Sequence, residues 1–567
     1  MSVSKRGLVV SIVLLLVISS FMSTLASSAS SAVTGGMSQA EHGLVNEIKG
    51  ESIARNASHM ENLAKANFAS RSAGSLGANQ TADWILSSFI SAGLSAAKEY
   101  FPFMTWDLTS RPSLVVDRDG SDLTQDDREQ LMSFNCEQWS KPTPSGGANA
   151  SLAVLPLPPA ETRSDLGVNP LSTVEWNQVD VTGRVLVIGR EVRWVSSWES
   201  SFIAKITAQR PAAVVFVWWY DWMAGLEGMF SSSAGGKPGG QSGPYFWDLD
   251  LPVGAVNYTE GLILREIALG SATALVKVES KLADAQQCNV AARIEGEIEP
   301  NRSVLVTAHY DSVLTPGFCD NAGGVSSVLE IARILSQAKA NGSYHPHYSI
   351  TFVAFSGEEL GYVGSINYVR MHPSEVSKAV AVINLDCIGA QTMVITRTEP
   401  DSMLDLDQVL LQCALDLGVS VVTEEPSGSD QDVFLDPEWA AGYYQQAWGL
   451  NAKIASVPPV LESVMLASRP ILYYGIWYDS EVGWIHTPRD DRSWANSTGW
   501  VTNEYLQQQT QVALLGLVRI SSGSPVPAAS GDDTLLLVGT GVVLAAVIIS
   551  GALIWKGRQR PDPPQQG

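Results

Sequence analysis

The chain has 567 residues, of which 45% are hydrophobic and 17% charged, and this is enough for two or three globular domains with cores of their own. The formal net charge is −22 at pH 7, with a sequence pI near 4.7. This acidity leaves no basic surface for nucleic acid, so we expect no nucleic-acid partner. Five sparse cysteines exclude a disulfide scaffold, and their pairing is left open: Cys136, Cys288, Cys319, Cys387 and Cys413.

The first and last segments predict a secreted, membrane-anchored chain. Residues 1–32 read as a signal peptide, because Lys5 and Arg6 precede an apolar run over 8–18 and small residues follow. An uncleaved anchor is the alternative there. Residues 534–555 read as a transmembrane helix that spans a bilayer core of about 30 Å. The basic tail, 556–567, is then cytoplasmic, and residues 33–520 lie outside the cell.

Glycosylation sequons agree with an extracellular location, although each alone is a weak signal. They occur at Asn56, Asn79, Asn149, Asn257, Asn301, Asn341 and Asn496.

The N-terminal part, residues 33–107, is expected to be helical. Apolar residues recur at helical spacing over His42–Ala66 and Ala78–Ala97, and the Ser/Gly/Arg-rich turn of residues 70–75 separates the two. Residues 108–284 change to short strands and Gly-rich loops, which predicts a separate domain of mixed class. The elements expected in it are strands at 185–188, 213–219, 251–256 and 274–278, with a helix at 201–209.

Residues 285–520 carry the most regular pattern. Strands are expected at 303–307, 349–355, 379–385, 464–466 and 471–474, with a helix at 324–337. Strands that alternate with helices predict an α/β domain with a mostly parallel sheet flanked by helices. Residues 521–533 are a Ser/Pro/Gly/Asp linker that leads to the anchor.

Metal-ligating side chains follow the predicted strands of this domain. In chain order they are His309 and Asp311, then Asp320, then Glu358 and Glu359, then Asp386, and finally His486. Because sites in open α/β sheets form at the carboxyl ends of strands, these groups are expected to converge. Each alone is ordinarily a helix cap or a solvated surface group. The ordered set is what predicts a site.

The residue types fit zinc chemistry. Two histidines and three carboxylates, one of them bridging, provide three protein ligands for each of two Zn²⁺ ions. Paired ions are a known hydrolytic device, and a further carboxylate outside the ligand shell serves as general base.

The motifs resemble the co-catalytic di-zinc aminopeptidases, a family that includes the vibrio and streptomyces leucine aminopeptidases, yeast aminopeptidase Y and glutamate carboxypeptidase. The motifs are Ala308–Ser312, Asp320–Gly324, Gly357–Glu359, Asn384–Asp386 and His486–Thr487. The resemblance covers about residues 289–520 well, and the helices of 37–106 look like the N-terminal part of the family.

The resemblance implies a role for each residue. His309 and Asp386 would hold one zinc, Glu359 and His486 the other, and Asp320 would bridge them. Glu358 would be the general base and Asp311 would orient His309, while Asp490 or Asp491 would do the same for His486. The expected activity is removal of N-terminal residues from peptides.

The inserted segment resembles a protease-associated domain, although more loosely. The matching residues are Val179–Val187, Ala204–Ile206, the strand at 213–219 and Leu251–Val253. Such a domain would cover the active site or restrict substrates, and a mere spacer is the alternative.

Two departures from the family leave questions open. Ile485 stands before His486 where some relatives have a tyrosine that helps hold the oxyanion, so Tyr443, Tyr444, Tyr473 and Tyr474 become candidates. Cys319 and Cys387 each adjoin a proposed ligand, and they are expected to be buried free thiols rather than a bridge.

Three rivals to an aminopeptidase remain. The first is a carboxypeptidase or dipeptidase on the same scaffold. A glutaminyl cyclase would use one zinc and is disfavoured by the full ligand set. A non-catalytic receptor would be expected to have lost ligands, and here all five are present with the base.

Overall fold

A computed structural model gives the structure of the protein. It describes residues 36–523 except for 69, 119–127, 132, 137–139, 156–179, 190–205, 218–250, 313, 399–403, 426–427, 449–456, 470–484 and 486–488. Within that part of the chain, no helix is long and apolar enough to cross a bilayer. The predicted signal peptide at 1–32 and the predicted transmembrane helix at 534–555 lie outside the described residues, so both stay predictions.

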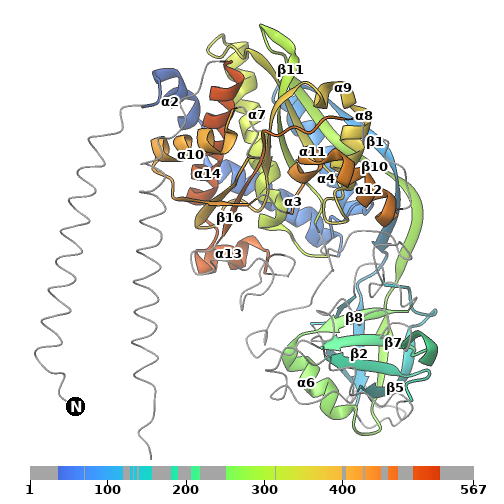
Figure 1. The fold of residues 1–567 in the computed structure, drawn as a ribbon. Coiled ribbons are helices and arrows are strands. Elements are labelled where there is room, and N and C mark those ends of the chain that lie inside the picture. The colour runs from blue at the N-terminus through green and yellow to red at the C-terminus, as the bar shows by residue number, and fades with distance from the viewer. Residues whose placement is uncertain are drawn as a thin grey trace, which may run out of the picture.

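The larger body is built on a sheet in the order β1-β10-β12-β11-β13-β16-β14-β15 (Figure 1). Its strands are β1 (Ser95–Leu108), β10 (Ser280–Ile294), β11 (Glu299–His309), β12 (Tyr348–Phe355), β13 (Ala379–Leu385), β14 (Thr392–Thr396), β15 (Val421–Glu424) and β16 (Ser463–Arg469). Strands β12, β11, β13 and β16 are parallel, as are β14 and β15. The pairs β1–β10, β10–β12 and β14–β16 are antiparallel. The prediction of a mostly parallel sheet is therefore correct for the central strands. The sheet as a whole is mixed, because it also contains antiparallel pairs.

Both faces of the central strands are covered, which explains their continuous apolar sequences. Along β11, Val304 and Val306 belong to one core and Leu305 to the other, because successive side chains point to opposite faces. The helices on the first side are α2 (Gln39–Asn46), α3 (Gly50–Ala66), α4 (Leu76–Ser91), α7 (Gly324–Ala340), α10 (Leu406–Leu417) and α14 (Asn503–Ser521). Those on the second side are α8 (Val363–Met371), α9 (Pro373–Val376), α11 (Gln431–Leu435) and α12 (Pro437–Trp448).

The N-terminal part is less helical than its periodicity predicts. The first expected helix is two helices, since α2 ends at Asn46 and α3 begins at Gly50. The second expected helix was to run to Ala97, but α4 ends at Ser91 and β1 begins at Ser95. Gly93, with φ of +84°, ends the helical path. Pairing with β10 along all of β1 then outweighs the local helical pattern.

Strands β1 and β10 run from the larger body toward a smaller one (Figure 1). Its sheet has the order β3-β2-β9-β5-β6-β7-β8-β4. The bounds are β2 (Ser113–Asp117), β3 (Arg128–Leu131), β4 (Asn135–Cys136), β5 (Ala148–Val154), β6 (Val185–Gly189), β7 (Ala213–Val217), β8 (Val253–Val256) and β9 (Thr273–Lys277), with helix α6 at Tyr258–Ile267.

The four strands expected in the inserted segment are β6 to β9. Of the helix expected at 201–209, only residues 206–209 are described, and they are helical. The smaller body is thus of mixed α/β class, and its likeness to a protease-associated domain stays a prediction.

Candidate active site

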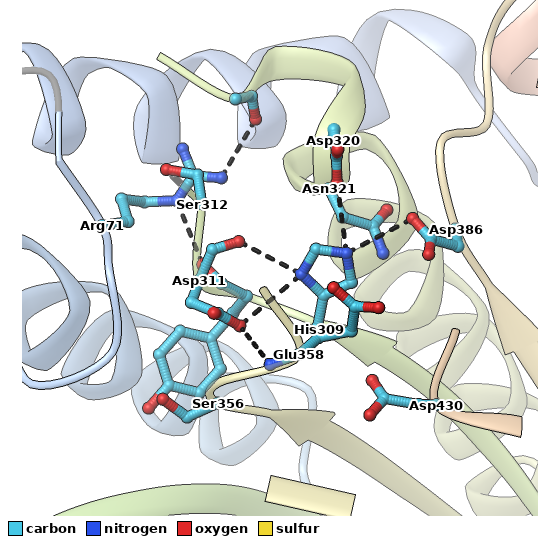
Figure 2. Close-up of polar contacts among 12 residues, drawn as sticks. Arg71, His309, Asp311, Ser312, Asp320, Asn321, Ser356, Glu358, Asp386 and Asp430 are labelled. Carbon is cyan, nitrogen blue, oxygen red and sulfur yellow. Dashed lines mark hydrogen bonds and ion pairs between the residues drawn. The ribbon is translucent and has the colours of Figure 1, made fainter. Parts of the chain in front are cut away.

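Four of the five predicted ligands come together where the central parallel strands end, and Figure 2 shows three of them, His309, Asp320 and Asp386. His309 is the last residue of β11, Glu358 and Glu359 follow β12, and Asp386 follows β13. Asp320 lies in the short π-helical turn η7 (Phe318–Gly323), which leads into α7. Because β12, β11 and β13 are neighbours in the sheet, their carboxyl ends bring these side chains to one place.

His309 stands at the centre of the cluster and is 1% exposed. Its Nε2 lies 3.2 Å from Asp320 Oδ1 and 3.3 Å from Asp386 Oδ1. On the other side of the ring, Nδ1 is 3.2 Å from the backbone oxygen of Asp311. A carbonyl oxygen only accepts, so Nδ1 donates this hydrogen bond and Nε2 is the ring nitrogen that faces the two carboxylates.

Asp311 orients His309 mainly through its backbone. Its carboxylate Oδ1 is 3.6 Å from Nδ1, farther than the carbonyl. The same Oδ1 accepts a hydrogen bond from the backbone N–H of Glu358 at 3.2 Å. Asp311 is fully buried, and it therefore connects the loop after β11 to the loop that carries the predicted base.

Burial lowers the pKa of His309, but the Asp386, Asp311 and Asp320 carboxylates outweigh it and hold the pKa well above its ordinary value. The metal-free imidazole therefore tends to be protonated among these acids. A cation at Nε2 would replace that proton, which is the usual linkage between metal binding and ligand deprotonation.

Asp386 is held by a residue that the sequence did not single out. The hydroxyl of Ser429 donates to Asp386 Oδ2 at 2.6 Å, while Oδ1 faces His309. Ser429 in turn accepts from the side-chain amide of Asn384 at 2.9 Å. One oxygen of Asp386 is thus oriented by the protein and the other is directed into the cluster, the usual arrangement around a metal-ligating carboxylate.

Glu358 and Glu359 lie in a tight turn after β12. Gly357 before them has φ of +83°, a conformation that glycine adopts without strain. The Glu359 side chain is 3% exposed, whereas Glu358 is more accessible. Burial raises the pKa of Glu358 well above its ordinary value, and the neighbouring Glu359, Asp386 and Asp430 carboxylates add to this. A raised carboxyl pKa suits a group that exchanges protons near neutral pH.

His486, the fifth predicted ligand, lies outside the described residues. Asp490 and Asp491, expected to orient it, have other partners. Asp490 accepts from the backbone N–H groups of Cys319 and Asp320. Asp491 caps helix α13 (Arg492–Thr498) through its side chain and pairs with Lys65. A role toward His486 stays a prediction for both.

The oxyanion candidates are also only partly described. Tyr473 and Tyr474 lie outside the described residues. Tyr444 is 3% exposed and accepts from Asn367 at 3.1 Å, as a core group does. Tyr443 stacks on Trp439 and lies next to Tyr362.

The cluster has the chemistry and spacing of a zinc site. Tetrahedral bonds of 2.0–2.2 Å place neighbouring ligand atoms about 3.3–3.6 Å apart. The distances from His309 Nε2 to Asp320 and Asp386 are 3.2 and 3.3 Å. Ligand atoms of His309, Asp320 and Glu359 lie within 4.8 Å of one another, and Asp320 also groups with Asp386 and Cys387. Asp320 belongs to both groups, but the groups do not separate into the two ligand sets of the resemblance, because His309 falls with Glu359 and not with Asp386.

Two buried charges near the cluster were missed by sequence reasoning. Asp430 precedes α11, is fully buried and accepts from the hydroxyl of Ser365. Burial raises the pKa of Asp430 to about 7, with the Asp311 and Asp386 carboxylates adding to this and His309 opposing it. Arg71 lies in the loop between α3 and α4 and is 0% exposed. A polar turn such as residues 70–75 gives no signal that its arginine is buried.

Cys319 and Cys387 meet beside the cluster as free, buried thiols. Hydrogen bonding between the two thiols raises the pKa of Cys387. Burial raises the pKa of Cys319 to about 11.

Comparison with known proteins identifies the larger body. Residues 289–505 match peptidase family M28. This match covers less than half of the chain, and it lies in the larger body that carries the site. Among similar sequences, the "Probable lipoprotein aminopeptidase LpqL" of Mycobacterium tuberculosis is 23% identical over 66% of this chain and 66% of that protein. Aminopeptidase YwaD of Bacillus subtilis is 42% identical over 15% of this chain and 18% of its own length.

The fold of the chain is similar to that of solved zinc aminopeptidases. An aminopeptidase from Aneurinibacillus sp. strain AM-1 aligns with a TM-score of 0.51 and 17% identity, covering 86% of this chain and 98% of that one. A zinc aminopeptidase from Bacillus subtilis aligns with a TM-score of 0.54 and 19% identity, covering 83% and 95%. The curated relatives are matched over 15% to 66% of their own lengths.

Proposed function

We propose that the protein is a two-zinc aminopeptidase of peptidase family M28 that removes N-terminal residues from peptides. The observation that supports this best is the position of His309 Nε2, which faces Asp320 and Asp386 at ligand-to-ligand distances typical of zinc. By this proposal His309 and Asp386 hold one ion, Glu359 and His486 hold the second, and Asp320 bridges both.

The chain's own residues supply proton transfer and orientation. Bound zinc would lower the pKa of a coordinated water and polarise the scissile carbonyl. Glu358 takes a proton from the attacking water and delivers it to the leaving nitrogen. Burial raises the pKa of Glu358, which is the direction that suits a carboxyl group that both accepts and releases a proton. The hydrogen bond from the backbone N–H of Glu358 to Asp311 fixes the position of the base relative to the His309 ligand.

A free α-amine fits the charge of the site. Glu358, Asp311, Asp430 and Asp490 are carboxyl groups beyond the five proposed ligands, and Arg71 is the buried cation described beside them. Those of these groups that are ionised favour a cationic ammonium group, against the positive charge of Arg71 and of the bound ions.

The experiment compares peptides with free and acetylated N-termini, with and without a chelator. We expect turnover of the free-amine peptides alone, and loss of that turnover in the chelator. Cleavage of the acetylated peptides from their carboxyl ends would instead identify a carboxypeptidase. Turnover that persists in a strong chelator would exclude the metal mechanism.

We further propose that the protein acts at the cell surface, with residues 33–520 outside and 534–555 as the anchor. The support is the sequence pattern of the two terminal segments. Protease shaving of intact cells tests this, since it should release the peptidase activity. Activity that stays with the cells unless they are lysed would contradict the placement.

A further inference from the structure

Arg71 belongs to the turn that separates α3 from α4, far in sequence from every proposed ligand. Three nearby polar side chains, Ser70, Ser72 and Ser75, are each at most 1% exposed. Ser75 caps α4 by accepting from the N–H of Ala78 at 3.1 Å. Ser70 Oγ accepts from the N–H of Ser72 at 3.2 Å. The turn is therefore fixed inside the protein, and Arg71 projects from it toward the site (Figure 2).

The guanidinium group of Arg71 bonds to the segment that joins two proposed ligands. Nε donates to the backbone oxygen of Tyr310 at 3.1 Å, Nη1 to that of Pro316 at 2.5 Å and Nη2 to that of Gly317 at 3.0 Å. Residues 310–317 connect His309, at the end of β11, to the turn that carries Asp320. The planar group thus fixes both ends of this loop at once.

Gly317 shows how close this contact is. Its φ is +64°, and a Cβ added there would lie 2.8 Å from Arg71 Nη2 and 2.6 Å from the backbone oxygen of Asp320. A side chain at 317 would therefore push the loop away from the guanidinium group or away from the ligand turn. Arg71 can lie this close to the loop only because residue 317 is a glycine, which has no side chain.

The charge of Arg71 has an equally specific setting. Burial lowers its pKa, and four carboxylates oppose that effect: Asp490, Asp311, Asp320 and Glu359. Two of these are proposed metal ligands. The three hydrogen bonds of the guanidinium group go to backbone carbonyl oxygens and not to these carboxylates. Arg71 therefore places positive charge beside the proposed ligands, while the carboxylate oxygens of the ligands remain directed to the site.

We propose that Arg71 is a positioning residue for the paired metal site, one that sets the distance between the His309 imidazole and the bridging Asp320 carboxylate. This rests on the proposed two-zinc function. Without the guanidinium group, Tyr310, Pro316 and Gly317 would lose the hydrogen bonds that join the His309 end of the loop to the Asp320 end. Asp490 would still hold the turn of Asp320, but nothing from Arg71 would fix its distance from His309.

The test measures metal binding directly in Arg71→Met and Arg71→Lys. Each protein is stripped of metal and titrated with Co²⁺, and bound metal and the visible absorption of Co²⁺ are recorded. We expect two ions in the wild type, at least tenfold weaker binding of one ion in Arg71→Met, and an altered spectrum. Arg71→Lys keeps the positive charge but not the planar set of N–H donors. Its affinity for the weaker ion should therefore lie between those of the wild type and Arg71→Met. Arg333→Met is the matched control, because Arg333 pairs with Glu330 on α7 away from the site, and it should bind as the wild type does.

Circular dichroism of the metal-free proteins separates positioning from unfolding. A folded Arg71→Met that binds both ions with wild-type affinity and spectrum would overturn the inference. Absence of Co²⁺ binding in the wild type would overturn the two-zinc proposal itself. If neither Arg71 variant folds, Gly317→Ala decides, since it retains the guanidinium group and displaces the loop. Two unperturbed Co²⁺ sites in folded Gly317→Ala would count equally against the inference.

Discussion

The carboxylate of Asp490 accepts a hydrogen bond from the backbone N–H of Asp320, with Oδ2 and the nitrogen 3.0 Å apart. Its Oδ1 accepts from the N–H of Cys319 at 2.7 Å, and its backbone oxygen from the N–H of Phe318 at 3.0 Å. Three successive N–H groups of the ligand turn therefore bond to one fully buried residue. Asp490 stands four positions after His486, the fifth predicted ligand, in the sequence, and it bonds to the turn that carries Asp320, the proposed bridging ligand.

Asp490→Ala should be strongly destabilising, because it leaves two buried N–H groups without an acceptor. Each such group costs about 1–3 kcal/mol, so we expect the free energy of unfolding to fall by roughly 2–6 kcal/mol. Metal affinity should fall as well. Differential scanning fluorimetry and metal titration measure both. Asp491→Ala is the control, since Asp491 caps a short, partly exposed helix and should cost only about 1 kcal/mol. Equal effects of the two variants would contradict the special role of Asp490.

Glu358→Gln should preserve the shape of the site while removing its base. We expect kcat to fall by a factor on the order of 10²–10⁴ with both metal ions still bound. Steady-state kinetics and elemental analysis of the purified variant provide the measurement. Glu359→Gln, one residue on, should instead weaken metal binding. The two roles are interchanged if Glu358→Gln is the variant that loses an ion, and Glu358 is no base if its variant keeps full activity.

Ser429→Ala removes the hydroxyl that orients Asp386. Loss of a partner to a metal-ligating group typically reduces metal affinity or activity by about 10–100-fold, and we expect a loss in that range. Competition with a coloured chelator measures the affinity. Ser377→Ala is a suitable comparison, because the Ser377 hydroxyl bonds only to a nearby exposed backbone oxygen. Wild-type affinity in Ser429→Ala would show that Asp386 is held well enough without this bond.

Removal of metal should abolish turnover and also lower thermal stability. Three proposed carboxylate ligands, Asp320, Glu359 and Asp386, converge beside His309, and without the bound ions their like charges repel one another. We expect zinc or cobalt to restore both activity and melting temperature after chelation. Magnesium should do so poorly, since the donor set includes imidazole. A melting temperature that is unchanged by chelation would indicate that the ligands are held together without metal.

The ion pair between His372 and Glu99 predicts a small pH dependence of stability. His372 Nε2 lies 2.9 Å from Glu99 on β1, and this hydrogen bond raises the pKa of His372 against the effect of burial. A group whose pKa is raised on folding stabilises the protein below its unfolded pKa, here 6.5. That stabilisation disappears as the pH rises through the folded value.

The pair is partly exposed, so its contribution should stay below about 1 kcal/mol. Melting temperatures of the wild type and Glu99→Gln at intervals from about pH 5.5 to 8.5 provide the test. The difference between the two proteins should be largest at the acidic end and vanish at the basic end. A constant difference across the range would assign the effect to packing instead.

Local sequence was sufficient for the ligand-bearing segments. The strands expected at 303–307, 349–355 and 379–385 are β11, β12 and β13. Each is a buried apolar run followed at once by acidic or imidazole residues, and both features are visible without a fold. Parallel strands then place His309, Glu359 and Asp386 at one edge. Chain order and residue type therefore predicted the centre of the site.

What the sequence could not provide is the set of partners that hold these ligands. Arg71 meets Tyr310 across 239 positions of the chain, Asp490 meets Asp320 across 170, and Ser429 meets Asp386 across 43. Nothing local distinguishes these residues from an ordinary turn arginine, a helix-capping aspartate or a loop serine. The sequence also did not predict the antiparallel strand β1 of the mixed sheet. The start of β1 has a helical pattern of apolar residues, but pairing with β10 makes it a strand. Residue spacing reports which side chains share a face of one element, whereas burial and partner choice depend on which elements pack together, and only the tertiary structure decides that.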